Sequence, residues 1–157
     1  MSLSQQDKDA IKEVLAKLDW YSHLQPSELN ALLAGFEKAS MVKGEVMITE
    51  GKTGEIFYIV ATGSVGIYLK RKLMDKQIAT LGPGEFFGEM SLISDELRSA
   101  SVVCEEDGLV FTLLRSTFRK VIMANPVVGA MIRKAAADRR SETRAIEFSE
   151  MMGRGME

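Results

Sequence analysis

One stretch of the sequence, residues 82–102, gathers residue types that together can bind an anion. Gly88 permits a backbone conformation closed to other residues, and Glu89 to Ile93 is long enough for one helical turn. The N-terminus of such a turn presents unpaired backbone N–H groups, which suit a negatively charged group. Arg98 then enters an expected strand, where its guanidinium can hold a phosphate through two parallel hydrogen bonds. Glu89 offers carboxylate oxygens that accept hydrogen bonds from a sugar hydroxyl.

The elements around this stretch are expected to be short strands, because segments rich in Val, Ile, Phe, Tyr and Thr alternate with glycine-containing turns. Several short strands at close spacing predict a sandwich or barrel of the jelly-roll type. The gaps are too short for helical crossovers, which argues against a Rossmann fold. The expected strands are Val46 to Thr49, Ile56 to Ala61, Ser64 to Leu69, Gln77 to Leu81, Ser99 to Cys104 and Leu109 to Leu113. The expected turns between them include Thr53–Gly54, Thr62–Gly63 and Asp107–Gly108.

Helices are expected on both sides of these strands. Apolar residues at helical spacing predict a first helix through Leu18, with Ser4 and Asp7 as a capping pair at its start, and a second helix after Pro26. After the strands, the pattern predicts a short helix capped by Ser116, an interruption at Asn125–Pro126, and a longer helix from Val127 through Arg140. The expected fold class is therefore α+β: an antiparallel jelly-roll β-barrel with flanking N-terminal and C-terminal helices and a short phosphate-binding helix.

Composition narrows the function. The 157 residues are 46% hydrophobic and 27% charged, which suits one soluble globular domain. The formal net charge of -2 gives no general attraction to nucleic acid, and no apolar run is long enough to span a bilayer. A single cysteine, Cys104, and a single histidine, His23, leave no metal cluster and no nucleophile–base pair. We therefore expect a cytoplasmic protein that is not an enzyme and holds neither a metal nor a cofactor.

Two segments, Phe87 to Ile93 and Arg98 to Val102, together resemble the phosphate-binding cassette of cyclic-nucleotide-binding domains, including the spacing from glutamate to arginine. That family includes the regulatory subunits of protein kinase A, the catabolite activator protein and cyclic-nucleotide-gated channels. The resemblance covers roughly residues 24–140 and extends to the glycine turns of the barrel. Those turns contain Gly44, Glu50–Gly51, Gly63 and Gly82–Pro83–Gly84.

The resemblance implies a ligand, cAMP or cGMP, and a role for each cassette residue. Arg98 would pair with the cyclic phosphate, Glu89 would accept from the ribose 2′-hydroxyl, and backbone N–H groups would complete the anion site. Ser99 offers a hydroxyl that can contact guanine in this family, but serine also occurs there in cAMP binders, and we favour cAMP. The implied ligand-binding residues of the cassette are Gly88, Glu89, Met90, Ser91, Leu92, Arg98, Ser99 and Ala100.

The helix after the barrel is expected to be the moving part, since family members close the open side of the bound base with a residue from it. Asn125–Pro126 is the expected hinge. Arg133 is our choice for the residue that stacks on the purine, in preference to Ile132 and Lys134, because a guanidinium is flat.

Two functions stay open at this point. The first is a stand-alone cyclic-nucleotide sensor that couples binding to movement of the C-terminal helix. The second is an interaction or scaffold module that kept the barrel and lost the ligand, with Glu89 and Arg98 as a structural ion pair. The expected organisation is an N-terminal helix over 1–23, a binding domain over 24–140 and a C-terminal extension over 141–157. Beyond the nucleotide, the expected partner is an unidentified protein or a second copy, through the terminal helices.

Overall fold

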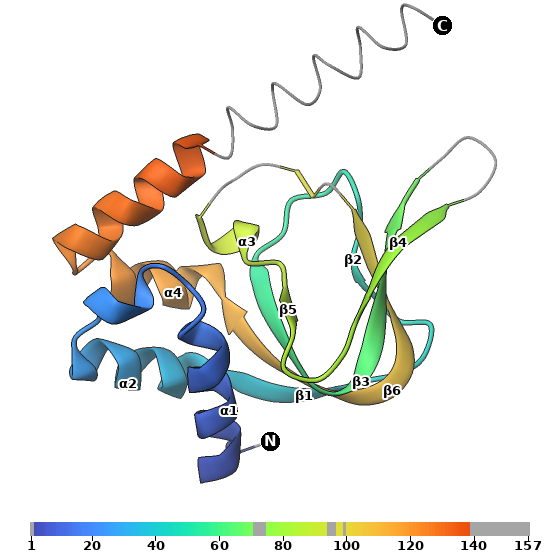
Figure 1. The fold of residues 1–157 in the computed structure, drawn as a ribbon, viewed down its shortest axis with the longest axis horizontal. Helices are drawn as coiled ribbons and strands as arrows, with labels where there is room; N and C mark the ends of the chain where they lie inside the picture. Colours follow the sequence, from blue (N-terminus) through green and yellow to red (C-terminus); the bar gives the residue numbers. More distant parts are fainter. Residues whose placement is uncertain (1, 71–74, 94–96, 99, 139–157) are drawn as a thin grey trace, which may run out of the picture.

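The computed structural model describes residues 2–70, 75–93, 97–98 and 100–138, and it places helices beside a curled antiparallel sheet (Figure 1). The helices are α1 (Gln5–Leu15), the 3-10 turn η1 (Tyr21–His23), α2 (Pro26–Gly35), α3 (Met90–Ile93) and α4 (Arg115–Ile122). The strands are β1 (Glu37–Met41), β2 (Val46–Ile48), β3 (Ile56–Leu69), β4 (Lys76–Leu81), β5 (Phe86–Phe87) and β6 (Ser101–Leu114). Residues 126–138 are helical as well and are called helix 126–138 below.

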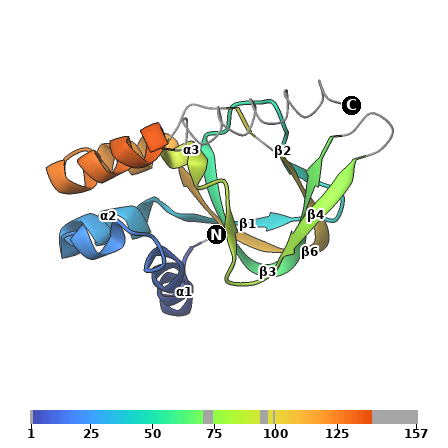
Figure 2. The same cartoon turned by 45° about the horizontal axis from the view of Figure 1, so that its top comes forward.

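The strands form one antiparallel sheet in the order β1-β6-β3-β4, with β2 paired to β6 and β5 paired to β3. The sheet curls into a roll, and α1, α2, α4 and helix 126–138 gather on one side of it (Figures 1 and 2). The expected antiparallel jelly-roll class is confirmed. The roll is not a closed barrel: within the described residues the path ends at β1 and β4, which do not pair with each other.

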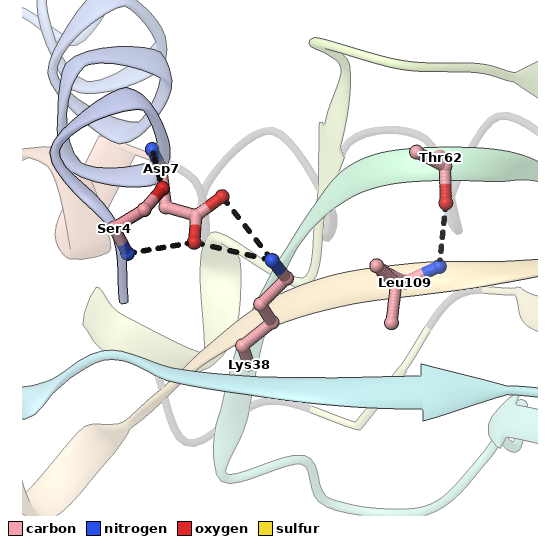
Figure 3. A network of polar contacts seen from close by, with 5 residues as sticks. All are labelled: Ser4, Asp7, Lys38, Thr62 and Leu109. Atoms are coloured by element: carbon pink, nitrogen blue, oxygen red, sulfur yellow. Dashed lines mark hydrogen bonds and ion pairs between the residues drawn. The ribbon is translucent and has the colours of Figure 1, made fainter. Parts of the chain in front are cut away.

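Two pairs of expected strands are each one long strand, because glycines that suggested turns form bulges instead. The register of β3 against β6 shifts repeatedly between Val60 and Val65. Gly63 has a φ of 83°, and a Cβ at Gly108 would overlap the carbonyl of Thr62. The Thr62 hydroxyl accepts a hydrogen bond from the Leu109 amide at 2.9 Å and so satisfies the interrupted ladder (Figure 3). Such bulges increase the local twist and help the sheet to curl.

The first helix is fixed at its start by the expected capping pair. Ser4 and Asp7 exchange two hydrogen bonds as a capping box, and the Asp7 carboxylate also pairs with the Lys38 ammonium at 3.2 Å (Figure 3). This ion pair joins α1 to β1. The expected cap of α4 was wrong: the helix begins at Arg115, so Ser116 lies in its first turn, and its N-cap Leu114 makes no side-chain hydrogen bond.

The buried residues form two clusters on opposite faces of the sheet. The first lies between the helices and the sheet and includes Ile11, Trp20, Phe57 and Phe118. The second fills the inside of the roll and includes Val60, Val65 and Cys104. Because Phe57 and Tyr58 are consecutive in a strand, they point to opposite faces, and Tyr58 packs against the inner cluster.

Asn125 joins the end of α4 to helix 126–138 and to the N-terminal helices. Its side-chain oxygen accepts from the amides of Val127 and Val128, both at 3.1 Å, which caps the new helix. Its side-chain nitrogen donates to the carbonyl of His23 and to the carboxylate of Glu28, both at 3.0 Å. The expected interruption at Asn125–Pro126 is therefore present, and its asparagine is tied to two other elements.

Candidate functional site

The cassette begins where β5 ends, and local packing fixes its position. The ring of Phe87 is buried and stacks on Tyr58, with ring centroids 4.8 Å apart and planes 10° apart. Gly88 then turns the chain with a φ of 80°, where a Cβ would also meet the Ile56 carbonyl at 2.8 Å. Leu92 of α3 is buried in the cluster beneath the helices. The short helix is thus held at both ends, between the sheet and the helices (Figures 1 and 2).

Arg98 is held by the segment that connects β2 to β3. Its amide donates to the Lys52 carbonyl and its carbonyl accepts from the Gly51 amide, both at 2.8 Å. The guanidinium Nη2 donates to the Ile56 carbonyl at 3.2 Å. Gly54 lies directly against the guanidinium, close enough that a Cβ there would overlap Nε, Nη2 and Cζ.

The Arg98 guanidinium has donors left over. It carries five N–H groups, and in the described part of the chain its side chain makes a single hydrogen bond, to Ile56. Its Nε is buried without a partner. Burial lowers the pKa of Arg98, while the Glu89 carboxylate acts in the opposite direction. A half-buried cation with unused donors is a group that an anion would stabilise.

Glu89 lies near Arg98 without pairing to it. Among the described residues the two side chains form no ion pair, although the carboxylate contributes a favourable electrostatic interaction to the guanidinium. The structural ion pair considered from the sequence is therefore not formed in this structure. Both side chains are only partly buried, so the Glu89 carboxylate keeps its capacity to accept hydrogen bonds from another group.

Two hollows adjoin these residues. A cavity of about 390 Å³ is lined by Arg98, Tyr58, Ile48 and the connecting segment from Lys52 to Ile56, among others. A groove of about 460 Å³ separates α3 from helix 126–138 and is lined by Glu89, Trp20, Leu92, Met131 and Lys134, among others. Arg98 lines the cavity and Glu89 lines the groove, so the cassette lies between the two hollows.

The structure brings most of the expected site residues together and leaves one apart. Gly88 adjoins Arg98, since a Cβ at Gly88 would lie 3.4 Å from Nη2. Ala100 is partly buried at the bend before β6. Met90 and Ser91 belong to α3, but their side chains, like the whole of Ser99, lie outside the described residues.

Arg133 is the expected residue that the structure leaves apart. It is exposed on helix 126–138, and its guanidinium lies back along the helix beside Gly129. The neighbouring Met131, Ile132, Lys134 and Ala135 line the groove that contains Glu89. In this structure Arg133 therefore does not face the cassette.

Sequence reasoning missed the contribution of the segment between β2 and β3. Ile56 acts through its backbone carbonyl, which leaves no mark on the residue type. Gly54 was interpreted only as a turn glycine, and Tyr58 only as part of a strand. The only signal in the sequence was that Gly54 precedes a strand that contains the aromatic Tyr58.

A family model described as Cyclic nucleotide-binding domain matches residues 38–125, which is more than half of the chain. The chain belongs to the cyclic nucleotide-binding domain family. The matched range runs from Lys38 in β1 to Asn125 after α4, so it includes Gly54, Arg98 and the whole cassette. The resemblance noted from the cassette residues is thereby confirmed.

Comparisons with individual proteins support the same assignment to the cyclic nucleotide-binding domain family. The chain is 35% identical over 106 residues to the Cyclic AMP receptor protein of Thermus thermophilus, covering 67% of this chain and 49% of that protein. It is 29% identical over 145 residues to a cGMP-dependent protein kinase of Plasmodium berghei, covering 92% of this chain and 16% of the kinase. The crystal structure of the Thermus thermophilus Catabolite Activator Protein superposes with a TM-score of 0.61 at 30% identity, over 89% of this chain and 63% of that one. The chain thus spans less than half the length of both curated relatives.

Within the described residues no helix combines the length and apolar character needed to cross a membrane, and no group of three His, Cys, Asp or Glu side chains is gathered as metal ligands would be.

Proposed function

We propose that this domain is a cytoplasmic sensor that binds cAMP, or cGMP, and that Arg98 is its main contact to the cyclic phosphate. The supporting observation is the half-buried Arg98 guanidinium, which has unused donors and lies beside Gly88 at the start of the cassette. A phosphate oxygen would satisfy these donors and neutralise the charge. Glu89 would accept from the ribose hydroxyl, and the backbone amides of α3 would complete the site.

The domain's own role is binding rather than catalysis. The cGMP-dependent kinase among its relatives is a much longer enzyme, of which this chain spans 16%. The Thermus relative that matches it is a receptor for cyclic AMP by name. The names of these two relatives refer to different nucleotides, cyclic AMP and cGMP. A binding experiment must therefore decide between cAMP and cGMP, and we expect cAMP.

The test is calorimetric titration of the protein with cAMP and with cGMP, in wild type and in Arg98→Ala. We expect Arg98→Ala to weaken binding by about 2 kcal/mol or more, as for loss of a buried charge-assisted contact. Lys120→Ala is the matched control, because Lys120 is an exposed cation on α4. Unchanged affinity in Arg98→Ala would refute the assignment. Absence of binding of either nucleotide to wild type would favour the scaffold module.

We further propose that helix 126–138 carries the response. It forms one wall of the groove that contains Glu89, so a ribose bound at Glu89 would lie next to it. Ligand can shift the helix only by binding one of its positions more tightly than the other. Hydrogen exchange over residues 127–138 should therefore slow with saturating nucleotide. Equal exchange rates with and without ligand would show that the helix does not respond to nucleotide and would refute this proposal.

A further inference from the structure

Tyr58 has a ring held by packing and a hydroxyl that no described residue hydrogen-bonds. It pairs with Phe87 across β3 and β5, and their stacked rings fix the tyrosine beside the start of the cassette. In the described part of the chain its hydroxyl makes no hydrogen bond. The contrast is Tyr68, whose hydroxyl donates to the Glu105 carboxylate at 2.7 Å. The position of the Tyr58 ring is therefore set without any use of its polar end.

The cavity beside Arg98 is where that hydroxyl can act. Tyr58 and Arg98 line the same space of about 390 Å³, which lies in the range of small-ligand sites. Both bring donors that no described residue accepts from, since Arg98 keeps its buried Nε unpaired. A buried donor such as this Nε is normally satisfied in the functional state of a protein, and the partly buried Tyr58 hydroxyl faces the same space. An oxyanion within reach of both would satisfy them together.

The phenol suits this role chemically. Burial raises the pKa of Tyr58, although the nearby guanidinium of Arg98 opposes the shift. A phenol with the ordinary pKa of 10.0 is already protonated at neutral pH, and the upward shift leaves the hydroxyl a donor. Arg98 would supply the charge, and Tyr58 would supply a directed neutral hydrogen bond.

We propose that Tyr58 is a second hydrogen-bond donor to the phosphate that Arg98 holds, an inference that rests on the proposed function. Its hydroxyl would contact one exocyclic oxygen of the cyclic phosphate. Tyr58 would thus favour a cyclic phosphate with oxygen at that position over one with sulfur there.

The first experiment compares Tyr58→Phe with wild type in titrations with cAMP. The substitution keeps the ring stacked on Phe87 and removes the donor. We expect affinity to fall about three- to ten-fold, as for loss of one neutral hydrogen bond. Tyr68→Phe is the matched control, because it removes a hydroxyl that is engaged on the outer face of the sheet. Equal melting temperatures for Tyr58→Phe and wild type would verify that the variant is folded.

The second experiment alters the ligand instead of the protein. The two phosphorothioate diastereomers of cAMP each replace one exocyclic oxygen by sulfur, which accepts hydrogen bonds poorly. The effect of Tyr58→Phe should shrink toward zero for one diastereomer and persist for the other, as a double-mutant cycle requires.

The outcomes distinguish the Tyr58 proposal from the proposed function on which it rests. If wild type binds cAMP and Arg98→Ala weakens it, but Tyr58→Phe binds as tightly as wild type, then Tyr58 is no donor and the proposed function stands. An equal effect of Tyr58→Phe on both diastereomers would overturn the phosphate contact. If wild type binds no cyclic nucleotide, both proposals fall.

Discussion

Gly54→Ala tests how the loop before β3 positions the Arg98 guanidinium. A Cβ at residue 54 would overlap Nε, Nη2 and Cζ of Arg98. Non-bonded heavy atoms separate to about 3.5 Å, so the guanidinium must retreat by on the order of 1 Å. Its 3.2 Å hydrogen bond to the Ile56 carbonyl would then break. The backbone of Gly54 is also held, because Arg115 donates to its carbonyl at 3.1 Å.

The expected result is a larger loss in ligand affinity than in stability. The overlapping atoms belong to the far end of a flexible side chain rather than to backbone, so the clash relaxes at a cost of about 1–2 kcal/mol of unfolding free energy. The same relaxation displaces the group that would bind phosphate. A displacement of on the order of 1 Å of a charge-assisted contact should weaken binding by about 10- to 100-fold, equivalent to about 1.4–2.7 kcal/mol.

The assay is calorimetry with cAMP alongside thermal melting. Gly82→Ala is the matched control, since a Cβ at Gly82 would meet nothing within 4 Å. In an Arg98→Ala background, Gly54→Ala should no longer destabilise the fold, because the atoms that it overlaps are gone. Wild-type affinity in Gly54→Ala, or an undiminished loss of stability in the Arg98→Ala background, would refute the reasoning.

Two further predictions concern titratable groups away from the cassette. The hydrogen bond from the Ser4 amide, aided by the bonds to Lys38 and the Ser4 hydroxyl, lowers the folded pKa of Asp7 below 3.8. The carboxylate therefore stabilises the fold above the unfolded pKa and ceases to do so as pH falls through the folded value. Asp7→Asn should lower the melting temperature at pH 7, and this difference should shrink as the pH falls below 3.8. A pH-independent difference would contradict this. Burial raises the pKa of the Cys104 thiol, so a thiol reagent at pH 7 should modify it only after unfolding, and rapid labelling of the native protein would count against its place in the core.

The cassette could be predicted from sequence because its information is local. The spacing from Glu89 to Arg98 lies within one short stretch, and the capping box of Ser4 and Asp7 spans a single turn. The interruption at Asn125–Pro126 is local too. In each case residues a few positions apart determine the geometry.

The partners of Arg98 could not be predicted, because they come from a distant segment and act through backbone. The Ile56 carbonyl is 42 residues away in the chain, and a carbonyl is present at every position. Gly63 and Gly108 were interpreted as turns because a glycine signals a positive φ or a close approach without saying which. Only the pairing of β3 with β6 shows that both lie within strands.

Arg133 shows a third limit. Successive helical residues are about 100° apart around the axis, so choosing between Arg133 and Lys134 requires the helix phase. That phase depends on where helix 126–138 starts, which Asn125 determines by capping Val127 and Val128. The sequence located the helix but not the face that it turns toward Glu89.

Asn125 also decides how helix 126–138 can move. Because Asn125 is hydrogen-bonded to the His23 carbonyl and the Glu28 carboxylate, the proposed movement of the helix would be a tilt about Asn125 rather than a slide along the helix axis. Residues 126–138 extend about 20 Å at 1.5 Å per residue, so a tilt of about 15° would carry the far end by about 5 Å and leave Asn125 in place. A small displacement of the helix at the groove would thus be larger at residue 138. Any opposing force would act on η1 and α2 through the two hydrogen bonds of Asn125.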